Sequence, residues 1–465
     1  MQRHIITGAH VATVDAAGTE HSGGHVVVDD HLITAVGAGA PPAWALEGRA
    51  PTGLPATEPV TVVRVDGRGH LLTPGLVNTH HHLYQWLTRG WAQDSILFDW
   101  LVALYPAWSR IDADLTRSAS LGAMGVLARS GCTTVGDHHY VFPRGSGDIV
   151  GGIVDAASTL GLRLHATRGS MDLGESQGGL PPDFAVETTG AALEASAAAV
   201  ERYHDASFES MVRVAIAPCS PFSVTPDLLR ESAVLARQLG VRLHTHCSET
   251  IEEDAYTREA FGMSPTDYLE SLGWLGDDVW MAHCVHLDDD AIAKFAATGT
   301  GVAHCPSSNG RLAAGIAPIP QLLAAGAPVG LGVDGSASNE SGQLGIEIRE
   351  AVLMNRLRAG ADRMSARQAL SVATIGGARV LGRQDEIGSI EVGKLADLAL
   401  WRVDGIEHAG IADPVAALAL GSQPPLTLLL VNGRPAVSEG RLVNADEDAI
   451  AREVASASAE LASRV

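Results

Sequence analysis

The sequence is poor in cysteine and has no long apolar run. Its five cysteines stand singly along the chain, and no Cys-x-x-Cys pair occurs. This distribution excludes a disulfide framework and argues against a zinc site built from cysteine. No run of about 18 apolar residues is present, which argues against a transmembrane helix. The first residues, MQRHIITGAH, lack the pattern of a secretory signal. We therefore expect a soluble, cytoplasmic protein.

Positive charge is also scarce. The chain has 32 Lys and Arg against 54 Asp and Glu, a formal net charge of −22. An acidic surface repels phosphate backbones, so nucleic acid and anionic membranes are excluded as expected partners. With 46% hydrophobic residues and only 18% charged residues, the chain can bury a large core and is not of the disordered class. Its 465 residues favour two domains.

The two ends of the chain share short β-like runs separated by turn residues. A Pro-, Gly- and Ala-rich stretch at 37–59 interrupts the first set and is expected to be a surface loop. Similar runs at both ends predict one composite β-sandwich domain, built from residues 1–68 and 382–445. The remaining tail, residues 446–465, has the spacing of a helix.

Residues 69–381 alternate short apolar runs with Ala- and Leu-rich amphipathic stretches. Eight runs are typical of parallel strands buried on both faces: HLLTPGLVNTH, CTTVGDHH, LRLHATR, VRVAIAPC, VRLHTHC, VWMAHC, TGVAHC and PVGLGVDG. Eight strand–helix units predict an α/β fold of the (β/α)₈ barrel type. A doubly wound sheet would share this alternation. No glycine-rich phosphate-binding motif follows the first run, so nucleotide binding has no support.

Histidine and acidic residues gather at the ends of these runs. His80 and His82 end the first run, His246 the fifth, His283 the sixth and Asp334 the eighth. The carboxyl ends of barrel strands converge on one face, where active sites are built. The alternation of side chains along a strand would also point His80 and His82 to the same side. We therefore expect all five side chains to meet in one cup.

This set of residues has the chemistry of a metal site. Asp334, in an otherwise apolar run, would be costly to bury unless it were paired or bound to a metal. Glu249 lies three residues after His246, which lets it reach a water in the cup without ligating the metal. Imidazole and carboxylate ligands without thiolate suit Zn²⁺, and Fe²⁺ would also fit.

The motifs around these residues resemble the amidohydrolase superfamily. They are GLVNTHHH (75–82), HCSE (246–249), AHC (282–284), GVDG (332–335) and IGSIEVGKLADLALW (387–401). The resemblance covers nearly the whole chain and implies a (β/α)₈ barrel with a composite β-sandwich. It implies that His80, His82, His246 and Asp334 bind the metal. It also implies that Glu249, His283 and Asp334 are catalytic, moving protons and orienting the attacking water.

The sequence favours one metal ion per chain. Binuclear members of the superfamily bridge two metals with a carbamylated lysine on the fourth strand. This chain has only two lysines, Lys294 and Lys394, and neither lies in the fourth run. That run, VRVAIAPC, offers no carboxylate either. The pattern therefore resembles the mononuclear deaminase branch.

Longer strings, including LARSGCTTVGDHHYVFP and GLGVDGSASN, look like the 8-oxoguanine deaminase group, which also takes in isocytosine- and triazine-directed deaminases. In guanine deaminases a glutamine three residues past the second ligand contacts the purine, and Gln85 matches that position. Those enzymes also place an arginine after the proline ending strand four, where this chain has Cys219, a departure that disfavours guanine. Arg168 is a further candidate substrate contact, with a structural salt bridge as the alternative.

The resemblance implies hydrolytic deamination of a small heterocycle, with 8-oxoguanine giving urate and ammonia, and isocytosine as a further substrate. The first alternative is a hydrolase that displaces an alkylamine or chloride from a triazine. Glu249 favours an amine, because amines need a proton to leave. Hydrolysis of a cyclic amide is disfavoured by the missing lysine, and a non-catalytic binding protein by the complete ligand set. The sequence leaves open whether the chain forms a homo-oligomer.

Overall fold

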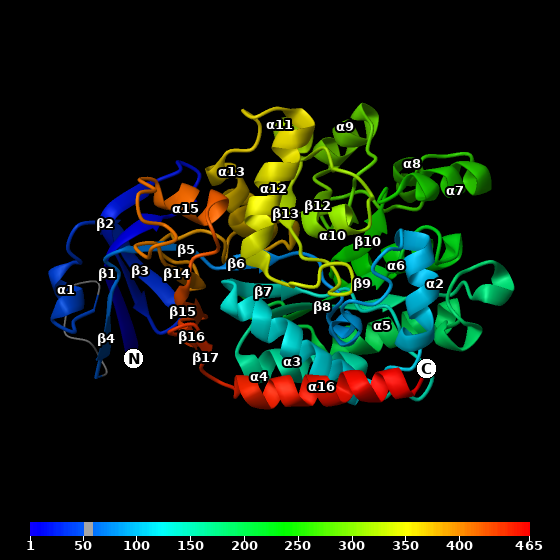
Figure 1. Ribbon diagram of the computed structural model, residues 1–465, viewed down its shortest axis with the longest axis horizontal. Coiled ribbons are helices and arrows are strands. Elements are labelled where there is room, and N and C mark those ends of the chain that lie inside the picture. Colours follow the sequence, from blue (N-terminus) through cyan, green and yellow to red (C-terminus); the bar gives the residue numbers. More distant parts are fainter. Residues whose placement is uncertain (51–58) are drawn as a thin grey trace.

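The computed structural model describes residues 1–50 and 59–465. Figure 1 shows a β-rich body formed by both ends of the chain beside a larger body in which helices surround a barrel. Of the expected loop at 37–59, residues 51–58 lie outside the described residues, and Ala43–Leu46 form the short helix α1. No helix in the described ranges is long and apolar enough to span a membrane.

The first and last parts of the chain form one nine-stranded sheet. Along it the strands run β17, β16, β15, β14, β5, β1, β2 and β3, and β4 pairs with β1. Their bounds are β1 Gln2–Ala12, β2 Glu20–Asp29, β3 Leu32–Ala38, β4 Thr61–Asp66, β5 His70–Pro74, β14 Leu398–Arg402, β15 Leu426–Val431, β16 Arg434–Ser438 and β17 Arg441–Leu442. The two ends join where β5 pairs with β14 in antiparallel register, His70 opposite Arg402.

Only the second half of the first expected run belongs to the barrel. The run divides at Gly75 into β5, which joins the composite sheet, and β6 (Leu76–Asn78), which joins the barrel. A Cβ atom at Gly75 would lie 2.2 Å from Cγ2 of Thr133, so only glycine lets the chain pass this close to the next strand. The composite sheet therefore extends beyond the expected boundary at residue 68.

The middle of the chain forms a closed barrel of eight parallel strands, which confirms the expected fold class. The strands are β6, β7 (Cys132–Gly136), β8 (Arg163–Ser170), β9 (Val212–Pro218), β10 (Leu243–Cys247), β11 (Val279–His283), β12 (Gly301–His304) and β13 (Val329–Leu331). They are ordered as in the sequence, and β13 closes the barrel against β6 through Leu331 and Asn78. Closure rules out the doubly wound alternative.

Helices surround the barrel and connect its strands (Figure 1). The longer ones are α2 (Leu97–Trp108), α3 (Ala113–Arg129), α4 (Ile149–Leu160), α5 (Thr189–Tyr203), α6 (Pro226–Leu239), α7 (Ile251–Phe261), α9 (Asp289–Thr298), α12 (Leu344–Ala359) and α16 (Glu447–Ser463). The shorter ones are η1 (Leu83–Thr88), η2 (Glu175–Gln177), η3 (Asp183–Ala185), α8 (Pro265–Ser271), α10 (Pro306–Arg311), α11 (Ile319–Ala325), α13 (Ala366–Ser371), η4 (Val372–Gly376), α14 (Gly377–Val380) and α15 (Pro414–Leu420).

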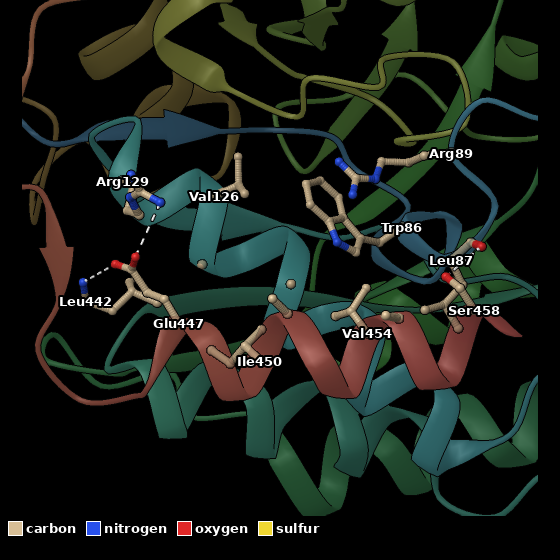
Figure 2. A pocket seen from close by; sticks show the side chains of 14 residues that line it. Trp86, Leu87, Arg89, Val126, Arg129, Leu442, Glu447, Ile450, Val454 and Ser458 are labelled. Carbon is tan, nitrogen blue, oxygen red and sulfur yellow. Dashed lines mark hydrogen bonds and ion pairs between the residues drawn. The ribbon is translucent and has the colours of Figure 1, made fainter. Parts of the chain in front are cut away.

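The last helix, α16, runs along the outside of the barrel. It buries Leu461 and packs across α3 and η1. Between these elements lies a groove of about 440 Å³, walled by apolar residues such as Val126 and Val454 beside Trp86 (Figure 2). At one end Arg129 pairs with Glu447 at 3.4 Å. The groove contains none of the expected site residues.

Candidate metal and catalytic site

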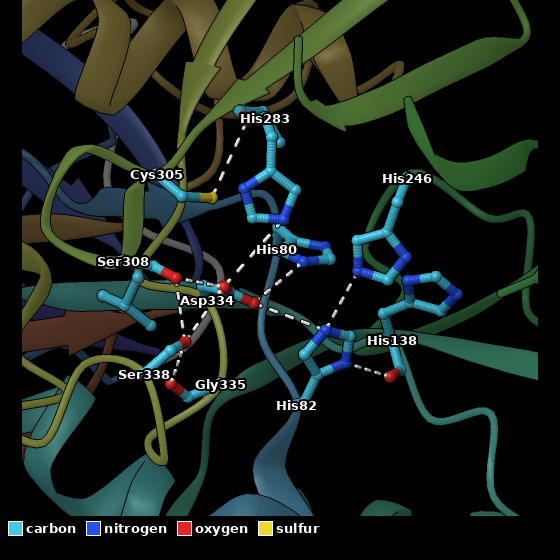
Figure 3. Close-up of polar contacts among 12 residues, drawn as sticks. His80, His82, His138, His246, His283, Cys305, Ser308, Asp334, Gly335 and Ser338 are labelled. Atoms are coloured by element: carbon cyan, nitrogen blue, oxygen red, sulfur yellow. Dashed lines mark hydrogen bonds and ion pairs between the residues drawn. The ribbon is translucent and has the colours of Figure 1, made fainter. Parts of the chain in front are cut away.

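The carboxyl ends of four barrel strands bring the expected residues together. His80 and His82 follow β6, His246 lies in β10, His283 ends β11 and Asp334 follows β13. All five side chains are buried and point into one cup (Figure 3). Two sets of potential ligand atoms lie within 4.8 Å of one another: His80, His82, His138 and His246, and His80, His283 and Asp334. The expected convergence is therefore present.

The central atoms of the cup are nitrogen and carboxylate oxygen. Oδ1 of Asp334 lies 3.1 Å from Nε2 of His80 and 3.3 Å from Nε2 of His82. Nε2 of His82 lies 3.2 Å from Nε2 of His246. Four potential ligand atoms from three strands thus face a common point, as a tetrahedral ion requires.

Backbone carbonyls fix the tautomers of two of these imidazoles. Nδ1 of His82 donates to the carbonyl of His138 at 2.5 Å, and Nδ1 of His246 donates to the carbonyl of Cys219 at 2.6 Å. A carbonyl can only accept, so the proton of each neutral ring is on Nδ1. Each Nε2 therefore presents a lone pair to the cup, the form that a metal binds. Burial lowers the pKa of both rings, which keeps them neutral.

A chain of three groups fixes the tautomer of His80. Nδ1 of His244 donates to the carbonyl of Trp280 at 2.9 Å, which leaves Nε2 of His244 as an acceptor. Nδ1 of His80 donates to that Nε2 at 2.8 Å. His244 itself is held flat against the Trp280 ring, with centroids 4.3 Å apart. Nε2 of His80 is thereby left unprotonated and directed at Asp334.

The residues present fit a divalent metal. Nε2 of His80 and Oδ1 of Asp334 are buried without a hydrogen-bond partner, because two acceptors face each other there. Buried polar atoms normally have partners, and a cation between these two would supply one. Three neutral imidazoles and one carboxylate form a donor set that suits zinc or iron.

The other oxygen of Asp334 is held by two hydroxyl groups. Oδ2 accepts hydrogen bonds from Ser308 at 2.5 Å and from Ser338 at 3.1 Å. These two hydroxyl donors favour the carboxylate form of Asp334. Asp334 also adopts a left-handed backbone conformation, with φ of 63°, a strain that is common at functional sites.

Glu249 and His283 lie together on the rim of the cup. Oε2 of Glu249 is 3.6 Å from Nε2 of His283, which is 3.9 Å from Oδ2 of Asp334. Nδ1 of His283 donates to Asn309 at 2.9 Å. Burial raises the pKa of Glu249 to about 7. Burial lowers the pKa of His283, but Glu249 and Asp334 outweigh it and the net shift is upward. Glu249 can therefore exchange a proton near neutral pH.

A second buried carboxylate, Glu253, holds the loop that carries Glu249. Its two oxygens accept the backbone N–H groups of Ser248 and Glu249, each at 2.9 Å. Ser248 has a positive φ of 51°, so this turn is strained and needs such support. Burial raises the pKa of Glu253 to about 7, and the hydrogen bonds from the two N–H groups lower it by a smaller amount.

We expect Glu253→Gln to lower kcat about 10- to 100-fold while zinc affinity stays unchanged. The amide nitrogen would face one backbone N–H, so one hydrogen bond is lost and Glu249 shifts; small misplacements cost rates of this order. Steady-state kinetics and zinc competition with a chelator measure the two quantities. Glu252→Gln, at an exposed position of the same helix, is the control. Wild-type kcat in Glu253→Gln would contradict the assignment.

Several residues of the site were not predicted. His138 packs flat against His246, with ring centroids 4.8 Å apart, and its carbonyl holds His82. His244, Asn309 and Glu253 hold groups that touch the cup. Two signals were available: His138 is the second-last residue of the second run, and the pair His244 and His246 repeats the spacing of His80 and His82.

Two of the three expected substrate contacts lie in the pocket over the cup. Gln85 and Cys219 line it, together with Leu97, Trp100, Leu101, Tyr105, Tyr140, Phe222 and Leu312. Gln85 is fully buried, and neither amide atom has a hydrogen-bond partner among the described residues. It packs so tightly on Gly335 that a Cβ there would lie 1.8 Å from Oε1 of Gln85. Its carboxamide is therefore free for a ligand.

Arg168 is not among the residues that line this pocket. Its Nη2 pairs with Glu187 at 2.7 Å, its Nη1 donates to the carbonyl of Gly169, and the guanidinium covers the Phe142 ring at 3.6 Å. The expected contact between Arg168 and substrate is therefore not supported, because its charge is used in a structural ion pair.

Comparisons with known proteins agree with this geometry. The model of the amidohydrolase family matches residues 71–435. The chain belongs to the amidohydrolase family. Among curated members, 8-oxoguanine deaminase of Pseudomonas aeruginosa is 44% identical over 97% of this chain and 98% of its own length. Hydroxydechloroatrazine ethylaminohydrolase of Pseudomonas sp. (strain ADP) is 38% identical over 97% and 94% of the two chains.

Solved structures of this amidohydrolase family share the whole architecture. Atrazine chlorohydrolase of Arthrobacter aurescens TC1, complexed with zinc, superposes with a TM-score of 0.90 at 33% identity, covering 98% of this chain and 100% of that one. The curated relatives are in the main deaminases, which confirms the expected class of hydrolases that act on carbon–nitrogen bonds in cyclic amidines. The His-rich centre is thus the metal site of an amidohydrolase.

Proposed function

We propose that this amidohydrolase is a mononuclear, zinc-dependent deaminase that converts 8-oxoguanine and water into urate and ammonia. The observation that carries the proposal is the protonatable carboxyl of Glu249, buried beside His283 at 3.6 Å and above Asp334. Attack on a carbon of an aromatic ring requires a proton on the adjacent ring nitrogen, and this group can supply one. The identity of 44% to an 8-oxoguanine deaminase supports the substrate.

The site would hold its metal through His80, His82, His246 and Asp334, and a bound Zn²⁺ would lower the pKa of water in the cup. Asp334 then accepts a proton from the attacking water, and Ser308 and Ser338 hold the carboxylate in place. His283, fixed by Asn309, orients the oxygen towards the ring.

Glu249 would deliver its proton to the ring nitrogen beside the carbon that is attacked. This step removes the aromatic resistance to addition and gives a tetrahedral carbon that bears both oxygen and the amine. The proton taken up by Asp334 passes to the amine, which leaves as ammonia. The hydroxyl group gives its proton back to Glu249, and a ring carbonyl remains. General acid–base steps of this kind contribute about 10²- to 10⁴-fold to the rate.

The pocket is nearly closed in this structure. Its volume is about 30 Å³, which is room for roughly two water molecules. Entry of a bicyclic ring therefore requires side chains that line the pocket to move, and Leu97 and Trp100 of α2 are among them. Once inside, the free carboxamide of Gln85 can pair with an amide-like ring edge, which offers one donor and one acceptor.

The alternative function is removal of an alkylamine or chloride from a triazine. The relatives that support it are the ethylaminohydrolase at 38% identity and the zinc-bound atrazine chlorohydrolase at 33%. The same cup would serve both reactions, because the metal ligands are common to them. The substrate-facing residues Gln85 and Cys219, rather than the ligands, would then decide between the two.

Ammonia release by the zinc-loaded protein tests the proposal. We expect turnover of 8-oxoguanine to exceed that of guanine at least 100-fold, with isocytosine as a slower substrate. Urate formation, followed by its absorbance, identifies the product, and metal analysis should give one zinc per chain. If all three rings were inert while an N-alkylated triazine was hydrolysed, the alternative would replace this proposal.

A further inference from the structure

Three neighbouring barrel strands begin with the same pattern, an arginine between two aliphatic residues. The sequences are LRL at the start of β8, VRV at β9 and VRL at β10. Because these strands are adjacent and parallel, Arg163, Arg213 and Arg242 meet at the amino-terminal end of the barrel, opposite the metal cup. The register places Arg213 directly beside His165 of β8. The proposed catalysis uses none of these residues.

A fourth arginine, Arg383, reaches the same place from the segment after α14. Arg383 and Arg163 both donate to the carbonyl of Ser210, at 2.9 and 2.6 Å. Arg383 and Arg213 both contact Glu386, at 2.7 and 2.6 Å.

Arg242 also lies against this segment. A Cβ on Gly382, next to Arg383, would be 2.7 Å from Nη1 of Arg242. We call these four residues, Arg163, Arg213, Arg242 and Arg383, the basal arginine cluster.

The basal arginine cluster carries more positive charge than its ion pairs neutralise. Asp397 pairs with Arg163 at 3.0 Å, and Glu386 is shared by Arg213 and Arg383. In the described ranges these two carboxylates form all the ion pairs of the four guanidinium groups. Nη2 of Arg242 donates to the carbonyl of Asp277 at 2.5 Å, which removes no charge. Two guanidinium groups therefore lack a paired carboxylate of their own, and the nearby charges of Asp278 and Asp277 offset part of the charge of Arg242.

The basal arginine cluster also holds unused hydrogen-bond donors. Nε of Arg213, Nε of Arg242 and Nη1 of Arg383 are buried and have no partner among the described residues, and neither does Nδ1 of His165. Guanidinium N–H groups can only donate, so each requires an acceptor. A water molecule would accept these bonds but would leave the charge, which is costly beside the fully buried Arg163 and Arg383; Arg213 and Arg242 are half-buried.

We propose that the basal arginine cluster binds a small inorganic anion, either an oxyanion such as phosphate or a halide such as chloride. The anion accepts the unused N–H groups and neutralises the excess charge. It joins the starts of β8, β9 and β10 to the segment around Arg383, which leads from the barrel into the composite sheet. Its effect is on stability, because the amino-terminal face of a barrel lies far from the catalytic end.

This anion site has independent electrostatic support. Burial lowers the pKa of Arg242 to about 10, and burial together with Arg163 and Arg213 does the same for Arg383. Burial and the neighbouring Arg242, Arg383 and Arg213 also lower the pKa of His165, so its ring stays neutral. These shifts describe a place where further positive charge is disfavoured and negative charge is favoured.

Thermal unfolding of the zinc-loaded full chain tests the site. Phosphate, and in a separate series chloride, is added in increasing concentration. A bulky organic anion is removed in equal amount, so that ionic strength and pH stay constant. We expect Tm to rise and to saturate, because a ligand that binds only the folded state stabilises it by mass action. In Arg242→Gln the half-saturating concentration should increase at least 10-fold. Arg242 pairs with no carboxylate in the described ranges, so this variant leaves no buried acid unpaired.

Arg230→Gln is the matched control, because Arg230 lies in α6 and pairs with Asp227, outside the basal arginine cluster. It should respond like the wild type. Saturation by phosphate alone identifies an oxyanion site, and saturation by chloride identifies a halide site. An equal, unsaturated rise in all three proteins would overturn the proposal. If Arg242→Gln does not fold, crystals soaked in bromide and, separately, in arsenate decide: an anomalous peak of either anion among the four arginines supports the site, and the absence of both refutes it.

Discussion

Replacing Glu249 with glutamine lowers kcat by about 10²- to 10⁴-fold and leaves one zinc per chain. The range is that of a general acid–base group. Glutamine keeps the shape of the side chain and its position beside His283, but it cannot give a proton to the ring nitrogen. Because Glu249 is not one of the four ligands, His80, His82, His246 and Asp334 would keep the metal. Ammonia release and metal analysis measure the two effects.

Two further measurements make this result specific to proton transfer. Glu259→Gln, on the exposed side of α7, should behave as the wild type. Wild-type kcat also depends on pH near 7, where Glu249 ionises, since burial raises its pKa to about 7. The protonated acid is the active form, so kcat falls as pH rises through that value. This fall in kcat should be absent from the pH–rate profile of Glu249→Gln. Unchanged kcat in the variant would exclude Glu249 as the acid.

Asp334→Asn removes the metal and the activity together. The asparagine side chain would keep the size of the original, but the anionic oxygen that lies 3.1 Å from Nε2 of His80 is lost. A neutral amide is a weak zinc ligand and cannot accept the proton of water. We expect zinc affinity to fall by more than about 100-fold, which exceeds the usual effect of residues outside the ligand shell. Turnover should drop to the background rate even when zinc is in excess.

Chelator competition separates Asp334→Asn from Glu249→Gln, because only the former should lose zinc. Glu340→Gln is the control on the same loop, since Glu340 pairs with Arg311 and lies outside the cup. Both zinc affinity and kcat should be unchanged in this control. Tight zinc binding by an inactive Asp334→Asn protein would mean that Asp334 handles protons without ligating the metal.

The sequence predicted the barrel well, because buried parallel strands have a simple signature. All eight apolar runs contribute a barrel strand, and the five polar residues at their ends converge as expected. The division of the first run at Gly75 was not predictable. It depends on the close approach of Thr133, which lies on another strand and is distant in sequence.

The supporting groups of the site were harder to predict than its ligands. His244 and Glu253 act through hydrogen bonds whose partners, His80 and the backbone of Ser248, are identified only by the folded geometry. Arg168 was expected near the substrate, but its partner, Glu187, lies in a loop beyond β8 that the sequence pattern does not place. Position at a strand end predicts that a side chain lies at the active face, but not which neighbour it contacts.

The junction between β5 and β14 also sets the order in which the protein can be completed during synthesis. After β5 has paired with β1, its other edge stays open until β14 emerges, about 320 residues later. At ~5–20 residues per second the ribosome needs roughly 15 to 65 seconds to make that segment. An unpaired strand edge is a template for aggregation throughout that time. The nascent chain must therefore keep this edge covered until the C-terminal strands close the sheet.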